Sequence, residues 1–435
     1  MNGLGVSHVR SWLLLLALIV LLGLVACSAQ GSPPPVATPQ PAASRTILVL
    51  WHAWPQPESR TLAGLVERFN RTTPGTQVVI QSRPAATLRA DLVAAITEGG
   101  GPHVALLPSH TLGGLADEGV LLPVDGVLSA EEVANLLPSA VGAASLSNGE
   151  VTTLYGIPIT FDTLALYYNQ ANFTGAPPTD TEALLATARG LTDTTSNPPR
   201  WGLALNLGLD RTLGYLYAFG GRIFDPQGRV ALGLEGRTGA EAWLGWLAAL
   251  REDQRVLASL DGIAVDNALA AQRAVMTIDW SYAAGTYHTI WPGSMGVAPL
   301  PRLTSTGQAP RPYVQSEVLI LNVRLSEPER EAAASFARFL LSEEAQRELL
   351  RAGRQPVLLS LDLNAEDAAL TPERQHAALV FRVQAEAGLP MPNTRLANEF
   401  VWSVLTDMHG SALRRLLTPA QAVESADTIL RSRLE

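Results

Sequence analysis

Asp279, Trp280 and Tyr282 are the side chains in this sequence best suited to hold a small ligand. They follow the apolar segment from Ala274 to Ile278, whose length and composition predict a short buried strand. The polar and aromatic loop that carries them opens the next predicted helix. In open α/β sheets, ligands bind in the crevice at the carboxyl ends of the strands. The position of the three residues therefore predicts a binding site.

The chemistry of these three residues suits a sugar. The apolar C–H face of a pyranose ring packs on an aromatic ring, and its hydroxyls need planar hydrogen-bond partners such as carboxylates. Buried aromatic residues mostly serve packing, so Trp280 and Tyr282 could equally cap the strand as core residues. The rest of the chain has to decide between these two interpretations.

The composition is typical of a globular protein with room for two lobes. The chain has 435 residues, of which 47% are hydrophobic and 16% are charged. Its formal net charge is -9, and all 31 basic residues are arginine. A protein that binds nucleic acid needs a basic face that replaces counterions, so no nucleic-acid partner is expected.

Residues 1–26 have the pattern of a secretory signal peptide. Arg10 precedes an unbroken apolar run from Trp12 to Leu22. The run is shorter than the ~20 apolar residues of a membrane span, and it leads to small residues. Leu24-Val25-Ala26-Cys27 resembles the bacterial lipobox, in which the cysteine is diacylated and becomes the mature N-terminus. Cys27 is the only cysteine, so lipid attachment explains it better than a stray thiol or half of a disulfide.

Residues 27–45 predict an extended tether. The segment is rich in Pro, Ala, Ser, Thr and Gln, with three consecutive prolines at 33–35. Such a composition cannot bury a core and favours a partly extended polyproline conformation. The folded part is therefore expected to stand off the outer face of a membrane, held by the lipid at Cys27.

The folded part begins with a βαβαβ pattern. Apolar runs at 46–50, 77–80 and 103–107 predict strands, and helical spacing lies between them. The segment Trp51 to Pro55 places two indoles and an imidazole after the first strand. This alternation with short turns predicts a parallel, doubly wound sheet. No Gly-x-Gly-x-x-Gly follows the first strand, so no dinucleotide and no other cofactor is expected.

Other residues that could do chemistry are assigned to structure. Tyr167 and Tyr168 lie in an apolar alternation that is typical of a strand. No cluster of Cys, His or carboxylates supports a metal site, so none is expected. His376 and His409 lie in helical, mostly polar surroundings and are interpreted as surface residues.

Capping patterns mark the starts of several helices. Ser129-Ala130-Glu131-Glu132, Thr179-Asp180-Thr181-Glu182 and Ser326-Glu327-Pro328-Glu329 have the spacing of a capping box. Thr371 and Thr418 each precede a proline, which suits the first helical position. The chain after Ser326 is accordingly expected to be mainly helical.

An ordered set of motifs resembles the extracellular sugar-binding proteins of ABC importers. The set begins with a strand followed by Trp51, a helix that ends in Phe69-Asn70, and Gly99-Gly100-Gly101-Pro102-His103. Next comes Leu115-Ala116-Asp117-Glu118-Gly119-Val120-Leu121-Leu122-Pro123. It continues with Tyr155-Gly156-Ile157-Pro158, Tyr167-Tyr168-Asn169, Phe219-Gly220-Gly221, Met276-Thr277-Ile278-Asp279 and Met391-Pro392-Asn393. The resemblance covers nearly all of the chain after the tether and leans toward the maltose and maltodextrin branch. Each motif is modest, but the order is specific.

The resemblance implies a two-lobed periplasmic-binding-protein fold of type II. Each lobe would be an α/β, doubly wound sheet flanked by helices, with a mainly helical C-terminal part. Crossings between the lobes are expected near Thr160 to Ala165, Arg311 to Val314 and Arg354 to Leu358. Lobe 1 would then comprise residues 46–162 and 312–356, and lobe 2 residues 163–311 and 357–435.

The resemblance also implies site residues. Asp162 matches an acidic hinge residue that accepts hydrogen bonds from sugar hydroxyls. Tyr282 stands where maltodextrin binders have a stacking Trp, and Trp402 stands where they have a Tyr. Asp210 and Arg211 fall near a Glu-x-Tyr-Phe subsite with different chemistry. The complete expected ligand site is Trp54, His110, Asp162, Asp210, Arg211, Asp279, Trp280, Tyr282 and Trp402.

Several positions depart from the pattern of the maltodextrin binders. Pro55-Gln56 replaces Asp-Lys, Leu107 replaces a platform Trp, His110-Thr111 replaces Asp-Arg, and Leu405 replaces Arg. Buried polar groups must be matched by groups on the ligand, so these changes alter which ligand fits. The architecture transfers, whereas maltose itself is not assumed.

The sequence as a whole predicts a lipid-anchored substrate-binding subunit of a carbohydrate ABC importer, and not an enzyme. It would be an extracytoplasmic monomer that captures a mono- or oligosaccharide by hinge closure and delivers it to permease subunits. Two alternatives stay open. A non-sugar solute such as a polyamine or a peptide could use the same scaffold. A secreted glycoside hydrolase could use Asp162 and Asp279, although no Gly-x-Ser-x-Gly or zinc-protease motif supports an enzyme.

Overall fold

The computed structural model of the protein describes residues 45–147, 149, 151–172, 175–225 and 229–434. The predicted signal peptide, the lipid attachment at Cys27 and the tether up to Ser44 lie outside these residues. Among the helices that are described, none is both long enough and apolar enough to cross a membrane.

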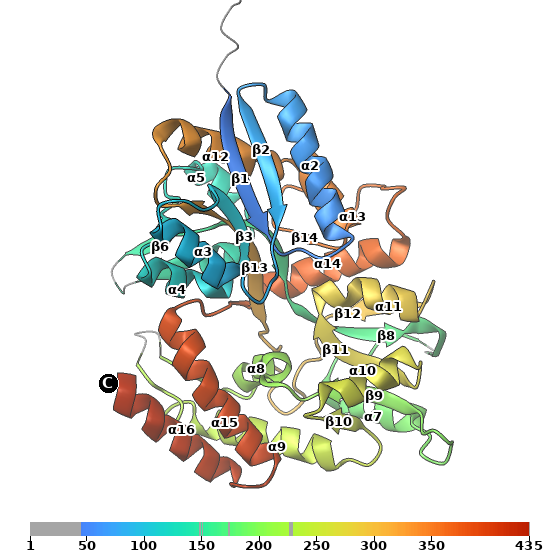
Figure 1. Cartoon of the computed structure of the whole chain (residues 1–435). Coiled ribbons are helices and arrows are strands. Elements are labelled where there is room, and N and C mark those ends of the chain that lie inside the picture. The colour runs from blue at the N-terminus through green and yellow to red at the C-terminus, as the bar shows by residue number, and fades with distance from the viewer. Residues whose placement is uncertain (1–44, 148, 150, 173–174, 226–228, 435) are drawn as a thin grey trace, which may run out of the picture. The chain divides into compact units, whose positions relative to one another are not determined.

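One of the two large sheets is mixed and contains eight strands. They are β1 (Thr46–His52), β2 (Thr76–Ser82), β3 (Val104–Pro108), β4 (Leu121–Leu122), β7 (Ile157–Asp162), β13 (Tyr313–Asn322), β14 (Gln355–Pro356) and β15 (Leu389–Pro390). The order is β14-β7-β13-β3-β1-β2, with β4 and β15 paired to β13 (Figure 1). β1 is parallel to β2 and β3, as the βαβαβ pattern predicted. β13 runs antiparallel to β3 and β7.

Helices and a small hairpin accompany this first sheet. The helices are α2 (Glu58–Thr72), α3 (Leu88–Thr97), α4 (Leu112–Asp117), α5 (Ala130–Ala134), α6 (Pro138–Ala143), α12 (Glu327–Leu340) and α13 (Glu343–Arg351). The hairpin is β5 (Ser145–Ser147) with β6 (Thr152–Leu154). Apolar residues of α2 recur every three or four positions, so one face of the helix is buried. On that face, Phe69 meets Phe336 of α12 with ring centroids 5.1 Å apart.

The second sheet has five strands in the order β10-β9-β11-β8-β12. Their bounds are β8 (Leu164–Asn169), β9 (Trp201–Asn206), β10 (Leu257–Ser259), β11 (Ala274–Trp280) and β12 (Met295–Ala298). β9 is parallel to β10 and β11, whereas β8 is antiparallel to β11 and β12. β11 continues two residues beyond the predicted strand because Asp279 and Trp280 still pair with Ala165 and Leu164.

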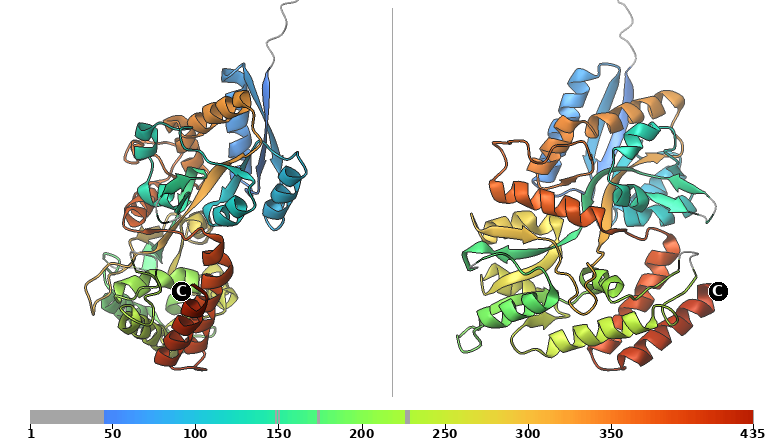
Figure 2. Two further views of the ribbon diagram at one scale, coloured as in Figure 1. Left: turned by 90° about the vertical axis from the view of Figure 1, so that its left-hand side faces the viewer. Right: turned by 180° about the vertical axis from the view of Figure 1, so that it is seen from behind.

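The helices that pack with the second sheet include much of the C-terminal part. They are α7 (Thr181–Leu191), α8 (Leu209–Ala218), α9 (Arg237–Glu252), α10 (Gly262–Ala270), α11 (Ala284–Ile290), α14 (Pro372–Glu386), α15 (Trp402–Leu413) and α16 (Pro419–Leu434). α15 and α16 lie against α9, and both views in Figure 2 show the three helices side by side. Short 3-10 turns are η1 (Ser109–Thr111), η2 (Gln170–Asn172) and η3 (Ser281–Ala283), and η4 (Ala397–Val401) is a π-helical turn.

The chain passes between the two sheets more than once. Only Thr163 separates β7 of the first sheet from β8 of the second. Residues 299–312 lead from β12 back to β13. After β14, α14 packs on β12 and β8, and β15 then pairs with β13 again. The predicted lobe boundaries, 46–162 with 312–356 and 163–311 with 357–435, stay a prediction.

The capping patterns are confirmed at Ser129 and Ser326, where the reciprocal bonds of a capping box form. Thr371 caps α14 as predicted. The third pattern is shifted by one residue, because the side chain of Asp180, not Thr179, accepts from the backbone N–H of Ala183 at 2.8 Å. Aspartate is among the preferred N-cap residues.

His409 is buried, so its predicted surface position is wrong. The residue is 2% exposed, and its ring lies 5.5 Å from the ring of Trp243. α15 turns His409 toward α8 and α9, a packing that the local polar sequence does not reveal. Burial, together with Arg414, lowers the pKa of His409 to about 4, against the effect of Asp210. His376 is exposed, as predicted.

His409 should make the fold sensitive to acid. The unfolded chain binds a proton at His409 near pH 6.5, whereas the folded chain resists it until about pH 4. The contribution of His409 to folding stability is therefore fully present above pH 6.5 and is lost as the pH falls from 6.5 toward 4. From pH 7.5 to 4.5 the loss from this group is about 2.5 kcal/mol.

Urea unfolding of wild type and His409→Gln at pH 7.5 and 4.5 measures this loss. The variant should lose less stability over the interval than wild type. His376→Gln, at an exposed position, is the matched control and should behave as wild type. Equal losses in all three proteins would contradict the assignment.

Candidate functional site

Asp162 and the turn after β11 meet where the two sheets adjoin. β7 ends at Asp162, and η3 begins at Ser281, directly after β11. The hydroxyl of Ser281 donates to Oδ1 of Asp162 at 2.7 Å, and its backbone N–H donates to the carbonyl of Thr163 at 2.8 Å. The backbone N–H of Tyr282 also bonds to Asp162. The two segments that carry Asp162 and Tyr282 are thus held together.

Glu58, Glu317 and Arg354 form a cluster of charged residues that acts on Asp162. The indole N–H of Trp54 donates to Oε1 of Glu317 at 2.9 Å, and the guanidinium of Arg354 lies 4.4 Å from the centroid of the Trp54 ring. Burial raises the pKa of Asp162 and of Glu317, and Arg354 opposes both shifts. Glu58 also acts electrostatically on Asp162. This cluster connects Trp54 to Asp162.

Two atoms of this cluster are unsatisfied. Within the part of the chain that the structure describes, Oε2 of Glu58 and Nε of Arg354 are buried and lack a hydrogen-bond partner. A buried polar atom costs free energy unless it is paired.

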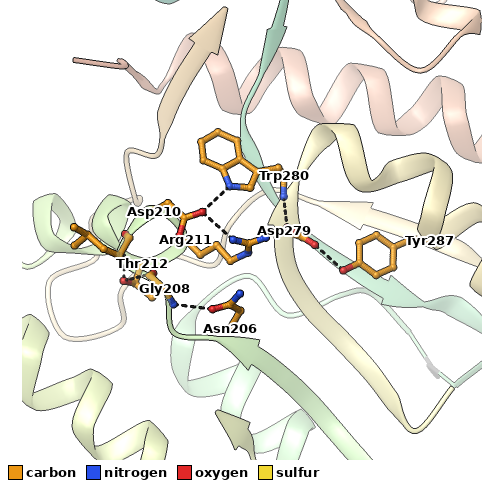
Figure 3. Close-up of polar contacts among 9 residues, drawn as sticks. Asn206, Gly208, Asp210, Arg211, Thr212, Asp279, Trp280 and Tyr287 are labelled. Atoms are coloured by element: carbon orange, nitrogen blue, oxygen red, sulfur yellow. Dashed lines mark hydrogen bonds and ion pairs between the residues drawn. The ribbon is translucent and has the colours of Figure 1, made fainter. Parts of the chain in front are cut away.

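A second polar group links α8 to β11, as Figure 3 shows. Arg211 contacts Asp210 at 2.8 Å and Asp279 at 3.0 Å. The indole N–H of Trp280 donates to Asp210 at 3.1 Å, and the hydroxyl of Tyr287 donates to Asp279 at 2.8 Å. Burial alone would lower the pKa of Arg211, but the two carboxylates outweigh it and raise the pKa. The predicted residues Asp210, Arg211, Asp279 and Trp280 are therefore brought together.

Tyr282 and Trp280 have different roles. Their rings are stacked with centroids 6.3 Å apart and an angle of 8° between the planes. Trp280 is 5% exposed and its N–H is already donated to Asp210, so it belongs to the core, whereas Tyr282 is 56% exposed. Burial around the hydroxyl raises the pKa of Tyr282 to about 12, against the effect of Arg211. The aromatic surface open to a ligand is that of Tyr282.

We call Asp162, Asp210, Arg211, Asp279, Trp280 and Tyr282 the polar site. Besides the contacts above, Tyr282 interacts electrostatically with Arg211, Asp279, Asp162 and Asp210, which ties its two halves together. Carboxylates, a guanidinium and an exposed phenol ring can hold a hydroxyl-rich, ring-shaped ligand. In the described part of the chain, no group of three or more His, Cys, Asp or Glu is placed to hold a metal ion.

His110 and Trp402 are placed by other contacts than those of the polar site. Trp402 begins α15 and lines a separate pocket with Tyr217 and Tyr313. Burial lowers the pKa of His110, and its carbonyl accepts from Nδ2 of Asn398 at 2.8 Å. Asn398 lies in η4, four residues before Trp402.

Sequence reasoning missed several residues around the polar site. Glu317 is the clearest, because a glutamate directly before the apolar run Val318 to Leu321 indicates a charged residue that is buried with a strand. Glu58 and Arg354 carry no comparable local signal, and only the fold places them near Asp162. Ser281 was overlooked between two aromatic residues.

The chain matches a family model described as bacterial extracellular solute-binding protein over residues 53–347. A curated relative is the maltotriose-binding protein of Pyrococcus abyssi (strain GE5 / Orsay), which is 24% identical over 180 residues. That match covers 41% of this chain and 38% of the relative, so it spans well under half of either protein.

Solved structures match over most of the chain. The maltose/maltodextrin-binding domain MalE from Bdellovibrio bacteriovorus, bound to maltotriose, is 25% identical with a TM-score of 0.70. The match covers 89% of this chain and all of that one. The Thermus thermophilus maltotriose binding protein has the same coverage, 23% identity and a TM-score of 0.70. A cyclo/maltodextrin-binding protein reaches 0.75 at 21% identity, over 90% of this chain and 98% of that one.

These likenesses establish the two-lobed type II fold. Its relatives are solute-binding proteins and not enzymes, which removes the glycoside-hydrolase alternative. Because the family model covers more than half of the chain, the protein belongs to the bacterial extracellular solute-binding proteins.

Proposed function

We propose that the protein is the substrate-binding lipoprotein of a carbohydrate ABC importer. In this proposal it captures a mono- or oligosaccharide outside the cytoplasm and delivers it to the permease subunits. The observation that carries the proposal is the exposed ring of Tyr282 beside the carboxylates of Asp162 and Asp279 and the guanidinium of Arg211. The sugars named for the matched structures support a saccharide as the ligand class.

The polar site would bind sugar hydroxyls in pairs. Asp279 and Asp210 already share Arg211, so their remaining lone pairs can accept hydroxyl hydrogens while Arg211 fixes their orientation. The ring of Tyr282 would pack on the C–H face of a pyranose. Trp54, His110 and Trp402 complete the proposed ligand-binding set, with Trp54 held by Glu317 and Arg354.

Capture would occur by hinge closure. A ligand can favour a closed form only through contacts that it makes better there than in an open form. Asp162 ends a strand of one sheet and Tyr282 follows a strand of the other. A sugar that contacts both residues would therefore bind the closed form better than the open form. The chain would bend at Thr163 and in residues 299–312. The protein would act as a monomer, without a cofactor or a metal.

A saccharide panel tests the ligand class. Isothermal titration calorimetry of the protein against mono- and oligosaccharides should give saturable binding to at least one of them. Tyr282→Ala should weaken that binding about tenfold or more, because stacking and apolar burial are both lost. Tyr282→Phe keeps the ring and should retain most of the affinity.

The control for this experiment is Ile47→Ala, which alters an exposed apolar residue at the start of β1. It should bind as wild type does. If only cationic solutes bind, the ligand is an amine and not a sugar. The acidic groups Glu58, Asp162 and Glu317 would then be the partners of its positive charge. No binding by any saccharide would contradict the proposal.

The anchor is proposed separately and rests on Leu24-Val25-Ala26-Cys27. The mature chain should begin at Cys27 and carry a diacylglyceryl group that holds it at the outer face of the cell membrane. Mass spectrometry of the protein from a bacterial membrane fraction should find this modified N-terminus. Cys27→Ser should lack the lipid mass, whereas Ser28→Ala should retain it. An unmodified Cys27 in the wild type would refute the anchor.

A further inference from the structure

Three carboxylates from distant parts of the chain meet around the end of β7. Asp162 ends this strand, and Glu317 lies in β13, which pairs with it. Glu58 opens α2 and acts electrostatically on Asp162, which in turn acts on Glu317. All three residues are half-buried, so each keeps some exposed surface. We call Glu58, Asp162 and Glu317 the carboxylate cluster.

The negative charge of the carboxylate cluster is not balanced by the chain. Arg354 favours the ionised forms of Asp162 and Glu317, but burial still raises the pKa of both. Oε2 of Glu58 is buried and has no hydrogen-bond partner among the described residues. Three carboxylates beside one guanidinium carry an excess of negative charge when they are ionised, and uncompensated buried charge is costly.

The hydroxyl of Thr160 is an independent sign of a ligand at this place. Thr160 is 0% exposed, and in the described part of the chain its Oγ1 has no hydrogen-bond partner. Side chains two residues apart on a strand share a face, so Thr160 lies on the face of Asp162. Its register partner across the strand pair is Glu317. Because buried hydroxyls are normally paired, Thr160 indicates a polar ligand group between the two acids.

An ammonium group fits these partners better than a sugar hydroxyl or a metal ion does. It has three N–H donors and a positive charge, whereas a hydroxyl has one donor and no charge. A metal ion such as calcium needs oxygen ligands at ~2.3–2.6 Å. Among the described residues, no three carboxylates or histidines are placed to hold one. An ammonium accepts the longer contacts of ~2.7–2.9 Å that are usual for charge-assisted hydrogen bonds.

The polar site has a similar excess of negative charge. There, two carboxylates, Asp210 and Asp279, share the single guanidinium of Arg211. Both carboxylates and Asp162 act electrostatically on the hydroxyl of Tyr282. A neutral sugar would leave this excess uncompensated in both groups, whereas a cationic one would reduce it.

We propose that the ligand is a saccharide with a protonated amino group, which the carboxylate cluster binds while the polar site binds the hydroxyls. This inference rests on the proposed function and narrows the substrate class to amino sugars. The ammonium donates to Glu58, Asp162 and Glu317, and the hydroxyl of Thr160 is a further acceptor. Because Asp162 belongs to both groups, the amine and the ring that packs on Tyr282 are parts of one ligand.

Titration calorimetry with matched pairs of sugars tests this inference. The pairs are glucose with glucosamine, glucose with 6-amino-6-deoxyglucose, maltose with 2-amino-2-deoxymaltose, and cellotriose with chitotriose. Within a pair the skeleton is the same, and an amine replaces a hydroxyl. At about pH 6.5, below the pKa of an amino group, at least one amine should bind about tenfold or more tightly than its neutral partner.

Glu317→Gln tests the role of the charge. Glutamine keeps an oxygen that can accept from the indole N–H of Trp54 and removes the negative charge. The ratio of the amine's affinity to that of its neutral partner should fall about fivefold or more. Glu67→Gln removes an exposed carboxylate of the same helix as Glu58 and is the matched control, in which the ratio should stay as in wild type.

Thr160→Val tests the unpaired hydroxyl with little change in volume. Because this hydroxyl has no partner in the free protein, urea unfolding should show no loss of stability. Calorimetry should show weaker binding of the amine, by about threefold or more. A loss of stability with unchanged amine binding would show that the hydroxyl serves the fold and would contradict its role toward the ligand.

The other outcomes separate this inference from the proposed function. Neutral sugars that bind as tightly as the amines, or a Glu317→Gln protein that keeps the wild-type ratio, would overturn the inference and leave the proposed function standing. The same holds if a neutral saccharide binds and none of the amino sugars does. If no sugar of either kind binds, the proposed function fails, and the inference falls with it.

Discussion

The hydrogen bond between the hydroxyl of Ser281 and the carboxylate of Asp162 is the contact on which the site depends. It ties the end of β11 in one sheet to the end of β7 in the other, across a connection in which Thr163 alone separates β7 from β8. Burial makes an unpaired carboxylate costly. Asp162 is therefore satisfied partly by Ser281 and the Tyr282 backbone, and the positive charge of Arg354 also favours its ionised form.

The polar groups near this contact between the two sheets form hydrogen-bond and ion-pair networks. Arg211 holds Asp210 and Asp279 at once, and Trp280 and Tyr287 each donate to one of these carboxylates. Each acid keeps acceptor capacity after these bonds, because an ionised carboxylate has about four lone-pair sites. The networks orient the carboxylates before a ligand arrives, and preorganisation of this kind reduces the cost of binding.

The sequence predicted the elements well where hydrophobic periodicity is strong. The first strands, α2, α3 and the capping boxes at Ser129 and Ser326 follow local patterns and are confirmed. The ordered motifs predicted the family, which the comparisons establish. The prediction for His409 was wrong because its burial depends on how α15 packs on α9. The polar residues that flank it in the sequence do not indicate that contact. The sequence pattern predicted Thr179 as the N-cap of α7, whereas the N-cap is Asp180, one residue later.

The candidate site was predictable only in part. Strand ends and polar-aromatic composition indicated Asp279, Trp280 and Tyr282, but burial alone separates the core role of Trp280 from the exposed Tyr282. Trp402 begins α15 and lines a pocket with Tyr217 and Tyr313, a placement that its local sequence does not predict. Glu58, Glu317 and Arg354 come from distant parts of the chain, and no local spacing predicts their meeting.

A crystal structure of the protein with its tightest-binding saccharide tests the central claim most directly. The account predicts electron density for a sugar whose hydroxyls bond to Asp162 and Asp279 and whose ring packs on Tyr282. A saccharide bound elsewhere, with these three residues untouched, would contradict it.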